Sequence, residues 1–375
     1  MNVFIIAAPY QVLSAIEAIQ YFNCKNNILI ILYIGLFSKK SFYKVIDKKY
    51  WDSIRFSNFF YYFSKYDFSK NRPKNISERL IELYLTFDQL RKRKFIDNLC
   101  KSIGFVENLF LGNYLIDYDL HMRHIANHVQ YKSLFLIDVG TDTLRINRQR
   151  INENLTISSR SQKNFTHVEK KYTYLESFSI VAIKNKITSS LVEWDKNGVD
   201  KLTYFTCYPL RVNGKDQIVN NSYTYSKSLI KKLSRSQDIF FLGQPLVDQG
   251  YLNLESLIIY IKNIKNYFNG SSLIYVPHPR ESKKYVKVIQ NDIGIKIKKN
   301  IAPFEYEIVF GNSQPKCIAA FFTSALETCA AIFGDTIELL SFQLPQDCLL
   351  KDKDTIKKIY ENFNSNNNIK VIALI

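Results

Sequence analysis

The stretch 238-DIFFLGQPLVDQGYLNLESLIIYIKNIKNYFNGSSLIYVP-277 indicates the fold class of the chain. Its ends, 238–243 and 273–277, are short apolar runs typical of buried strands, and residues 254–268 between them repeat apolar side chains at helical spacing. Two buried strands joined by a helix form a unit in which the strands run parallel. The stretch therefore predicts an α/β architecture with a parallel sheet.

The same alternation extends over the rest of the chain. Further strands are expected at 3–8, 27–35, 106–112, 133–138, 202–207, 318–323 and 335–340, and further helices at 11–22, 77–100 and 225–235. A length of 375 residues favours two domains. The polar segment 211-RVNGKDQIVNNSYTY-225 is the expected linker, because it follows one strand series and precedes a fresh helix. We expect domains at 1–212 and 213–375.

The charge of the chain indicates an anionic partner. The formal net charge is +17, from 51 Lys and Arg against 34 Asp and Glu. Nucleic acid, a phospholipid surface and an acidic substrate all fit such a charge. The basic runs 91-RKRK-94 and 145-RINRQR-150 are short, and no zinc-finger spacing or RNP-like strand accompanies them, which disfavours nucleic acid.

Cysteine usage and the opening residues indicate the compartment. The six cysteines are scattered without a CxxC pair, as expected of reduced thiols in the cytoplasm. The start 1-MNVFIIAAPYQVLSAIEAIQ-20 has no basic n-region and is interrupted by polar residues, so we expect neither a signal peptide nor a membrane span there. The expected location is cytoplasmic, with peripheral attachment to the inner membrane as an option.

Polar residues follow five of the predicted strands at their carboxyl ends. These segments are 8-APYQ-11, 138-DVGTDT-143, 243-GQP-245, 277-PHPRE-281 and 323-TSALET-328. In open parallel sheets, ligands bind outside the carboxyl ends of the strands. We therefore expect these five segments to line one cleft between the domains.

Several common site motifs are missing from the sequence. No GxGxxG follows the first strand and no GxxxxGK[ST] occurs, which disfavours dinucleotide enzymes and P-loop NTPases. His124 and His128 have helical i, i+4 spacing, but without the glutamate of an HExxH motif a metal site there is disfavoured.

Six stretches, in this order, resemble a family of bacterial sialyltransferases. They are 7-AAPYQVLSA-15, 138-DVG-140, 242-LGQPL-246, 277-PHPRE-281, 303-PFEYE-307 and 323-TSALET-328. Together they are similar to the lipooligosaccharide sialyltransferases of glycosyltransferase family 52 and the related capsular polysialyltransferases. The resemblance implies a GT-B fold, that is, an N-terminal acceptor-side and a C-terminal nucleotide-binding Rossmann-like domain facing a central cleft.

The resemblance also implies a reaction. It is the transfer of a nonulosonic acid from its CMP ester to a sugar hydroxyl, with inversion at the anomeric carbon. Separately from the resemblance, we expect no metal or other cofactor. Asp138 holds the position of the family's general base, although the second acidic residue of that motif is Val139 here. Asp142 is the competing base, and an ordinary helix-capping role of Asp138 is the alternative to both.

His278 corresponds to the family's leaving-group acid. The departing CMP gains negative charge on its phosphate, and an imidazole donor beside it lowers the barrier electrostatically. Pro277 and Pro279 restrict the backbone on both sides of this histidine. The alternative is a histidine whose hydrogen bonds are satisfied within a turn.

The remaining candidate residues are assigned to the CMP donor. Thr323 and Ser324 are expected to hold the phosphate at a helix N-terminus, with a simple capping box from Ser324 to Glu327 as the alternative. The resemblance assigns Glu305 to the ribose hydroxyls, against the alternative of an exposed glutamate. The donor is also expected to meet a rim of small residues at Gly243 and Gln244, and the Arg280 cation, for which an ion pair with Glu281 is the alternative.

Three classes of function remain open. The first is a CMP-nonulosonate-dependent transferase acting on lipooligosaccharide or capsule, with a lipid-linked acceptor, an anionic membrane surface and a second copy of the chain as further partners. The second is a GT-B transferase that uses another nucleotide sugar. The third is a non-catalytic component of a polysaccharide assembly complex.

Overall fold

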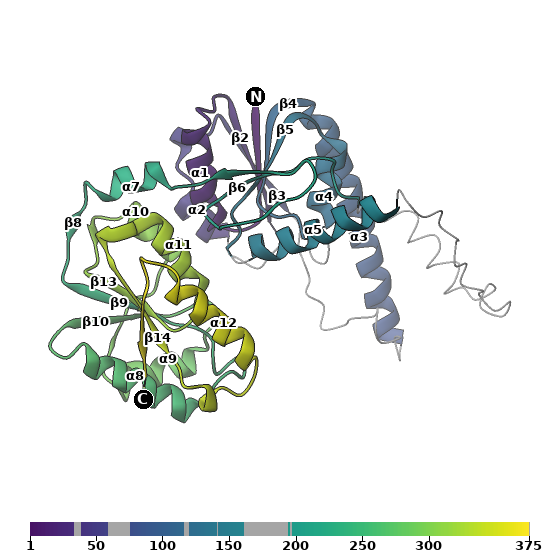
Figure 1. Ribbon diagram of the computed structural model, residues 1–375. Helices are drawn as coiled ribbons and strands as arrows, with labels where there is room; N and C mark the ends of the chain where they lie inside the picture. Colours follow the sequence, from purple (N-terminus) through teal and green to yellow (C-terminus); the bar gives the residue numbers. More distant parts are fainter. Residues whose placement is uncertain are drawn as a thin grey trace. The chain divides into compact units, whose positions relative to one another are not determined.

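A computed structural model describes residues 1–33, 39–58, 76–115, 120–140, 142–160, 194–195 and 197–374. The chain forms two compact units, Met1–Asn220 and Asn221–Ile375, drawn in purple to teal and in green to yellow in Figure 1. Each unit contains its own parallel sheet flanked by helices.

The first unit contains a seven-stranded sheet in the order β3-β2-β1-β4-β5-β6-β7. All neighbouring strands in it are parallel. The strands are β1 Asn2–Ile6, β2 Asn27–Tyr33, β3 Ser53–Asn58, β4 Phe105–Leu111, β5 Gln130–Ile137, β6 Thr203–Thr206 and β7 Gln217–Asn220; the helices are α1 Gln11–Tyr21, α2 Lys39–Val45, α3 Ile76–Ile103, α4 Leu120–His128 and α5 Asp142–Arg160.

Both faces of this sheet are buried, which explains why its strands read as continuous apolar runs. On one face, Phe110 stacks between Phe4 and Phe135 at centroid distances of 4.3 and 4.8 Å. On the other face, alternate residues such as Val3 and Ile5 join an aliphatic cluster. The period of two along β1 thus places aromatic rings on one side of the sheet and branched side chains on the other.

The second unit repeats the same strand order in its own six-stranded sheet, β11-β10-β9-β13-β14-β15. Its strands are β9 Asp238–Leu242, β10 Ser272–Val276, β11 Lys296–Ile297, β13 Cys317–Ala320, β14 Glu338–Gln343 and β15 Lys370–Ala373, with β8 Ser234–Arg235 and β12 Ser313–Gln314 as a separate pair; the helices are α7 Thr224–Ile230, α8 Leu254–Tyr267, α9 Lys283–Asn291, α10 Phe304–Val309, α11 Ser324–Phe333 and α12 Lys353–Asn364. Along its own chain this sheet has the order 3-2-1-4-5-6 of Rossmann folds, and the first sheet begins with it. The predicted α/β class with two Rossmann-like halves is confirmed.

The expected linker at 211–225 is only partly a linker. It contains β7, which pairs in parallel with β6 and completes the first sheet. It also contains Asp216, whose carboxylate accepts a hydrogen bond from Arg150 Nε at 2.9 Å, with both side chains 2% exposed. Because a strand and a buried ion pair bind this segment to the first unit, the units divide at 220/221 and not at 212/213.

Several elements lie outside the sequence-based expectations. Strands β3, β7 and β15 lie at sheet edges. Polar residues weaken the apolar signal of β3 and β7, whereas β15 is a short apolar run after Lys370. The strand expected at 335–340 begins at Glu338, after a short 3₁₀ turn at Gly334–Thr336. The strand expected at 318–323 already ends at Ala320.

Candidate functional site

The carboxyl edge of the first sheet carries two bridges between neighbouring strands. The first is the amide of Gln11, which is 1% exposed at the start of α1. Its Oε1 accepts hydrogen bonds from the main-chain N–H of Ala7 at 2.8 Å and of Ala8 at 3.0 Å, and its Nε2 donates to Gly112 O at 2.6 Å. Gln11 thereby joins the end of β1 to the end of β4, the point at which the strand order reverses.

The second bridge is Asp138, at the end of β5. Its carboxylate accepts from the main-chain N–H of Cys207, just beyond β6, at 2.8 Å, and lies 3.4 Å from Thr143 Oγ1. Burial raises the pKa of Asp138 to about 6, against the opposing hydrogen bonds from Thr206, Cys207 and Thr143. A carboxylate that titrates near neutrality suits a general base better than an ordinary aspartate does.

The neighbours of Asp138 bear on the competing assignments. Val139, which replaces the second acidic residue of the family motif, is 4% exposed and packs in the aliphatic core. Asp142 is the first residue of α5 and is partly buried. The choice of Asp138 over Asp142 stays a prediction.

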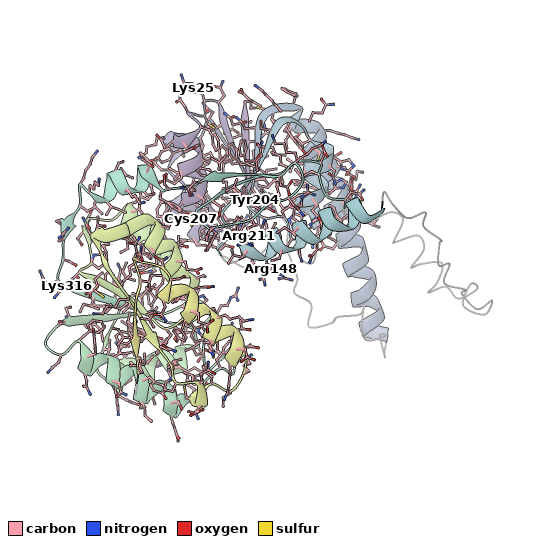
Figure 2. All side chains as sticks on the ribbon, viewed as in Figure 1. Lys25, Arg148, Tyr204, Cys207, Arg211 and Lys316 are labelled. Atoms are coloured by element: carbon pink, nitrogen blue, oxygen red, sulfur yellow. The ribbon has the colours of Figure 1, made fainter. Side chains whose placement is uncertain are left out.

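Basic side chains accompany this edge of the first unit. Asn147 Nδ2 of α5 donates to the main-chain oxygen of Arg211 at 2.8 Å, which holds the segment after β6 against the helix. Arg148 and Arg211 are exposed, and Figure 2 labels both with Cys207.

The carboxyl edge of the second sheet brings together the other candidate residues. Strands β10, β9 and β13 are neighbours in the sheet, and they are followed by His278, Gln244 and Thr323, respectively. Gln244 Oε1 accepts a hydrogen bond from the main-chain N–H of Phe322 at 3.1 Å, which joins the ends of β9 and β13 where this strand order reverses. Neighbouring strands lie about 4.8 Å apart, so the segments after β10 and β13 are separated by about 10 Å.

His278 is partly buried, and its protonation state follows from its contacts. Its Nδ1 accepts a hydrogen bond from the main-chain N–H of Arg280 at 3.1 Å, which requires Nδ1 to be unprotonated. Burial, assisted by the nearby Arg280 cation, lowers the pKa of His278. The imidazole is therefore neutral at neutral pH and carries its proton on Nε2, where it can donate to an anion.

Glu281 lies in the turn at residues 278–281, here named the histidine turn, and Gly243 lies next to it. The Glu281 carboxylate accepts from the Tyr275 hydroxyl and from the main-chain N–H of His278, each at 2.5 Å. A Cβ on Gly243 would lie 2.5 Å from the Tyr275 hydroxyl oxygen and closer still to Glu281 Oε2. Gly243 therefore makes room for this protein-internal pair, and its expected role toward a donor substrate stays a prediction.

The start of α11 differs from the expected capping box. Thr323, not Ser324, is the N-cap residue, and its hydroxyl accepts from the main-chain N–H of Ala325 at 3.3 Å. Glu327 is thus displaced from the capping position by one residue. Burial raises the pKa of Glu327, and its Oε2 is buried without a hydrogen-bond partner in the described part of the chain. Ser324 is left as the first helical residue, partly buried at the helix N-terminus.

Glu305 lies in the first turn of α10, a helix that runs from the end of β11 toward the start of β13. The side chain is partly buried and not exposed as its alternative supposed, and burial raises its pKa. Its neighbour Phe304 packs edge-on against Phe240 of β9 at a centroid distance of 5.8 Å. The helix thus lies against the strand that also leads to Gln244.

Arg280 is exposed, and the alternative of an ion pair with Glu281 finds no support. Both oxygens of Glu281 already accept hydrogen bonds, from Tyr275 and His278. The role of Arg280 toward a donor stays a prediction.

The histidines of α4 are engaged with protein groups. His124 Nε2 lies 2.8 Å from Asp97 Oδ1, and its Nδ1 accepts from the main-chain N–H of Asp195 at 3.3 Å. Both ring nitrogens are occupied, so this histidine has no lone pair left for a metal. The sequence also contains two acidic DxD triplets, of the kind that metal-dependent nucleotide-sugar transferases usually carry, at 117-DYD-119 and 352-DKD-354. The first lies outside the described residues. Among the described residues, no group of three or more His, Cys, Asp or Glu is placed to hold a metal ion.

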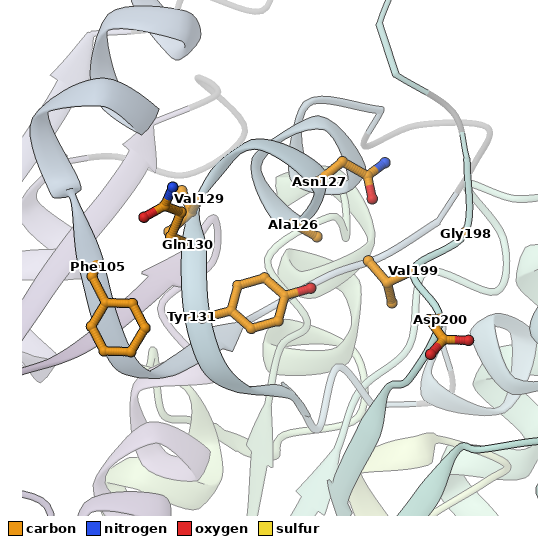
Figure 3. Close-up of a pocket in the computed structure, with 9 residues that line it drawn as sticks. All are labelled: Phe105, Ala126, Asn127, Val129, Gln130, Tyr131, Gly198, Val199 and Asp200. Atoms are coloured by element: carbon orange, nitrogen blue, oxygen red, sulfur yellow. The ribbon is translucent and has the colours of Figure 1, made fainter.

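A cavity of about 530 Å³ lies at the opposite, amino-terminal edge of the first sheet (Figure 3). Its lining residues come from the start of β4, the end of α4, the start of β5 and the segment before β6: Phe105, Ala126, Asn127, Val129, Gln130, Tyr131, Gly198, Val199 and Asp200. It contains none of the candidate site residues. The described helices also include none that is long and apolar enough to cross a membrane.

Comparisons with known proteins match the chain only to solved structures. No family model and no curated protein matches it. E. coli heptosyltransferase WaaC with ADP is 10% identical at a TM-score of 0.41, covering 96% of this chain and 99% of that one. Methanocaldococcus jannaschii UDP-GlcNAc 2-epimerase, in complex with UDP-GlcNAc and UDP, is 11% identical at a TM-score of 0.44; the match covers 100% of this chain and 89% of that one. Acinetobacter baumannii MurG is 9% identical at a TM-score of 0.37; the match covers 99% of this chain and 86% of that one. We therefore base the fold on the strand order alone.

The sequence missed the residues that support the site. Tyr275 reads as an ordinary strand residue, and Glu281 reads as a surface partner for Arg280. Nothing in their spacing indicates that they meet over Gly243. Gln11 was expected only as part of the polar segment 8-APYQ-11 at a strand end, and its role as a buried bridging amide was not predicted.

Proposed function

We propose that the chain is an inverting glycosyltransferase of GT-B type that moves a nonulosonic acid from its CMP ester to a hydroxyl of a bacterial surface glycan. The observation that carries the proposal is the carboxyl edge of the second sheet. Three adjacent strand ends there present an imidazole donor, an amide and a helix N-terminus with a hydroxyl. This is the chemistry that a phosphate monoester leaving group requires.

Both sheets have a glutamine bridge at the point where their strand order reverses, but Gln11 is buried whereas Gln244 is only partly buried. In the first sheet, the buried side chain of Gln11 occupies the space between the ends of β1 and β4. In the second sheet, the corresponding strands β9 and β13 lead to Gln244, Thr323 and Ser324. Because nucleotides bind at such switch points, this difference favours the second unit as the CMP-binding domain.

The proposed mechanism assigns one task to each side chain. His278 donates a hydrogen bond from its Nε2–H to the phosphate oxygen as the glycosidic bond breaks, while the N-terminus of α11, with Ser324, stabilises the growing negative charge. Glu305 accepts hydrogen bonds from the ribose hydroxyls. Asp138 in the first unit removes the proton of the attacking acceptor hydroxyl, so that the sugar is transferred with inversion.

The acceptor side of the proposal rests on the charge. A chain with a net charge of +17 suits an acceptor on a lipid anchored in an anionic membrane surface. The exposed Arg148 and Arg211 lie in the first unit, where the resemblance places the acceptor.

Incubation of the purified protein with CMP-sialic acid, with CMP release as the readout, tests the proposal. We expect release from CMP-sialic acid, little from UDP- or ADP-sugars, and a loss of at least about 100-fold in His278→Ala. Release only from another nucleotide sugar would favour the second class of function. Release from none, with an intact fold, would favour a non-catalytic protein.

A further inference from the structure

We propose that Glu281, held between the Tyr275 hydroxyl and the main-chain N–H of His278, is a positioning residue that fixes the turn carrying the His278 imidazole. The expected effect of Glu281 on turnover rests on the proposed function. The expected effect of Glu281 on the conformation of the turn does not.

The geometry closes the turn from both sides. Glu281 Oε2 accepts from His278 N at 2.5 Å, and Glu281 N donates back to His278 O at 2.9 Å. The other carboxylate oxygen is anchored in the sheet, because Tyr275 lies in β10 and is 1% exposed. The histidine turn is thereby tied to a rigid strand through a single carboxylate.

Gly243 is the third part of this arrangement. It follows β9, and its own main-chain N–H donates to Val276 O at 2.8 Å. Any side chain at this position would overlap Glu281 and Tyr275. The glycine thus lets the carboxylate lie against the end of the neighbouring strand, where Asp248 is the other nearby acid.

The ionisation of Glu281 links the turn to pH. Burial raises the pKa of Glu281 to about 7, with the Asp248 charge adding to the rise and the hydrogen bonds from Tyr275 and His278 opposing it. The ionised carboxylate accepts a hydrogen bond on each oxygen, from Tyr275 and from His278. In the protonated acid, the oxygen that carries the proton accepts only weakly. The turn is therefore held more firmly above pH 7 than below it.

Three variants separate the effect of the Glu281 hydrogen bonds from the effect of its charge. Glu281→Ala removes both hydrogen bonds. Glu281→Gln keeps one acceptor for His278 N–H and places an amide against the Tyr275 hydroxyl, which can turn to accept, so the shape persists without the charge. Tyr275→Phe removes a bond that lowers the pKa of Glu281, so that pKa must rise. Glu255→Gln, an exposed glutamate on α8, is the matched control.

The first experiment is independent of activity. The ring ¹³Cε1 signal of His278, assigned among the five histidines by loss in His278→Asn, is titrated by NMR in the full-length protein. We expect one inflection below pH 6.5, from protonation of the His278 ring itself, and a smaller second inflection near pH 7, from ionisation of Glu281. Glu281→Gln loses the second inflection, Tyr275→Phe moves it upward, and Glu255→Gln leaves it unchanged. A missing second inflection in the wild type, or one that persists in Glu281→Gln, overturns the proposal.

The second experiment uses CMP release at pH 8. Glu281→Ala lowers kcat by about tenfold or more, with a smaller change in donor KM, and Glu281→Gln stays within about threefold of the wild type. Full kcat in Glu281→Ala, or an equal loss in both variants, contradicts a positioning role. If the chain proves inactive altogether, the titration still decides whether Glu281 holds the turn.

Discussion

At the residue scale, the same carboxyl group takes different properties from its surroundings. Asp138 is a buried acid and Glu281 a partly buried one, and burial raises their pKa values to about 6 and about 7. Asp97, by contrast, is hydrogen-bonded to His124 and Arg93, and these partners lower its pKa in spite of partial burial. Desolvation prevails where the hydrogen-bond donors are neutral, and it is outweighed where a cation is among them.

Asp138→Asn is expected to lower turnover by about 100-fold or more, because positioned proton transfer contributes about that much. A base must be deprotonated, so wild-type kcat/KM should fall as the pH drops through about 6, the pKa of Asp138. The measurement is CMP release across pH 5 to pH 9, with Asp142→Asn as the matched control. If Asp138→Asn keeps near-full activity and Asp142→Asn does not, Asp142 is the base.

At the element scale, two neighbouring hydroxyl residues at the start of α11 have different expected roles, one structural and one in binding the donor. Thr323 caps α11, whereas Ser324 makes no side-chain contribution to the cap. Thr323→Ala should therefore cost about 1 kcal/mol of the free energy of unfolding. Ser324→Ala should leave stability unchanged and raise the donor KM by about tenfold, as expected from loss of a charge-assisted hydrogen bond. Denaturant unfolding and donor titration measure the two effects, and the reverse pattern would exchange the two assignments.

The junction of β1, α1 and β4 depends on a single amide. Gln11→Ala would leave two buried N–H groups and one buried carbonyl without their partner, at a cost of about 3 kcal/mol or more. Gln20→Ala, at an exposed position of the same helix, is the control and should change stability little. Gly112→Ala should resemble Gln11→Ala, because its Cβ would lie 2.7 Å from Gln11 Cδ. Equal stability of the two glutamine variants in chemical denaturation would show that the bridge contributes nothing.

At the scale of the whole molecule, the chain is two units that each complete their own sheet. The first is closed by β7 and by the ion pair between Arg150 of α5 and Asp216, the residue directly before β7. Removing one partner of such a buried pair typically costs 3–5 kcal/mol, since the other charge stays buried.

A fragment of residues 1–220 should therefore fold with cooperative thermal unfolding, and a fragment of residues 1–212 should not. The shorter fragment loses β7 and leaves Arg150 buried without Asp216. The fragment 221–375 should fold alone and bind CMP, which calorimetry can measure. Similar melting of 1–212 and 1–220 would restore the boundary expected from composition, and CMP binding by 1–220 would move the nucleotide to the first unit.

The sequence by itself determined the α/β class, the alternation of strands and helices, and which strand ends carry polar groups. These features depend on local periodicity, and a strand buried on both faces cannot hide its apolar run. The positions of Asp138, Gln244, His278 and Thr323 at strand ends follow from the same local pattern. Edge strands such as β3 and β7 were not predicted because one side of each is free of sheet partners and polar residues interrupt their apolar runs.

Only the tertiary structure decided the contacts between residues distant in sequence. Asp216 belongs to the first unit because Arg150 is buried beside it, 66 positions earlier. Gly243 serves Glu281 and Tyr275 because β9 and β10 are neighbours in the sheet. Val139 is apolar because its side chain faces the core, a direction that no motif reveals. Periodicity along a chain specifies elements, but the free energy of burying a charge depends on what meets it in space.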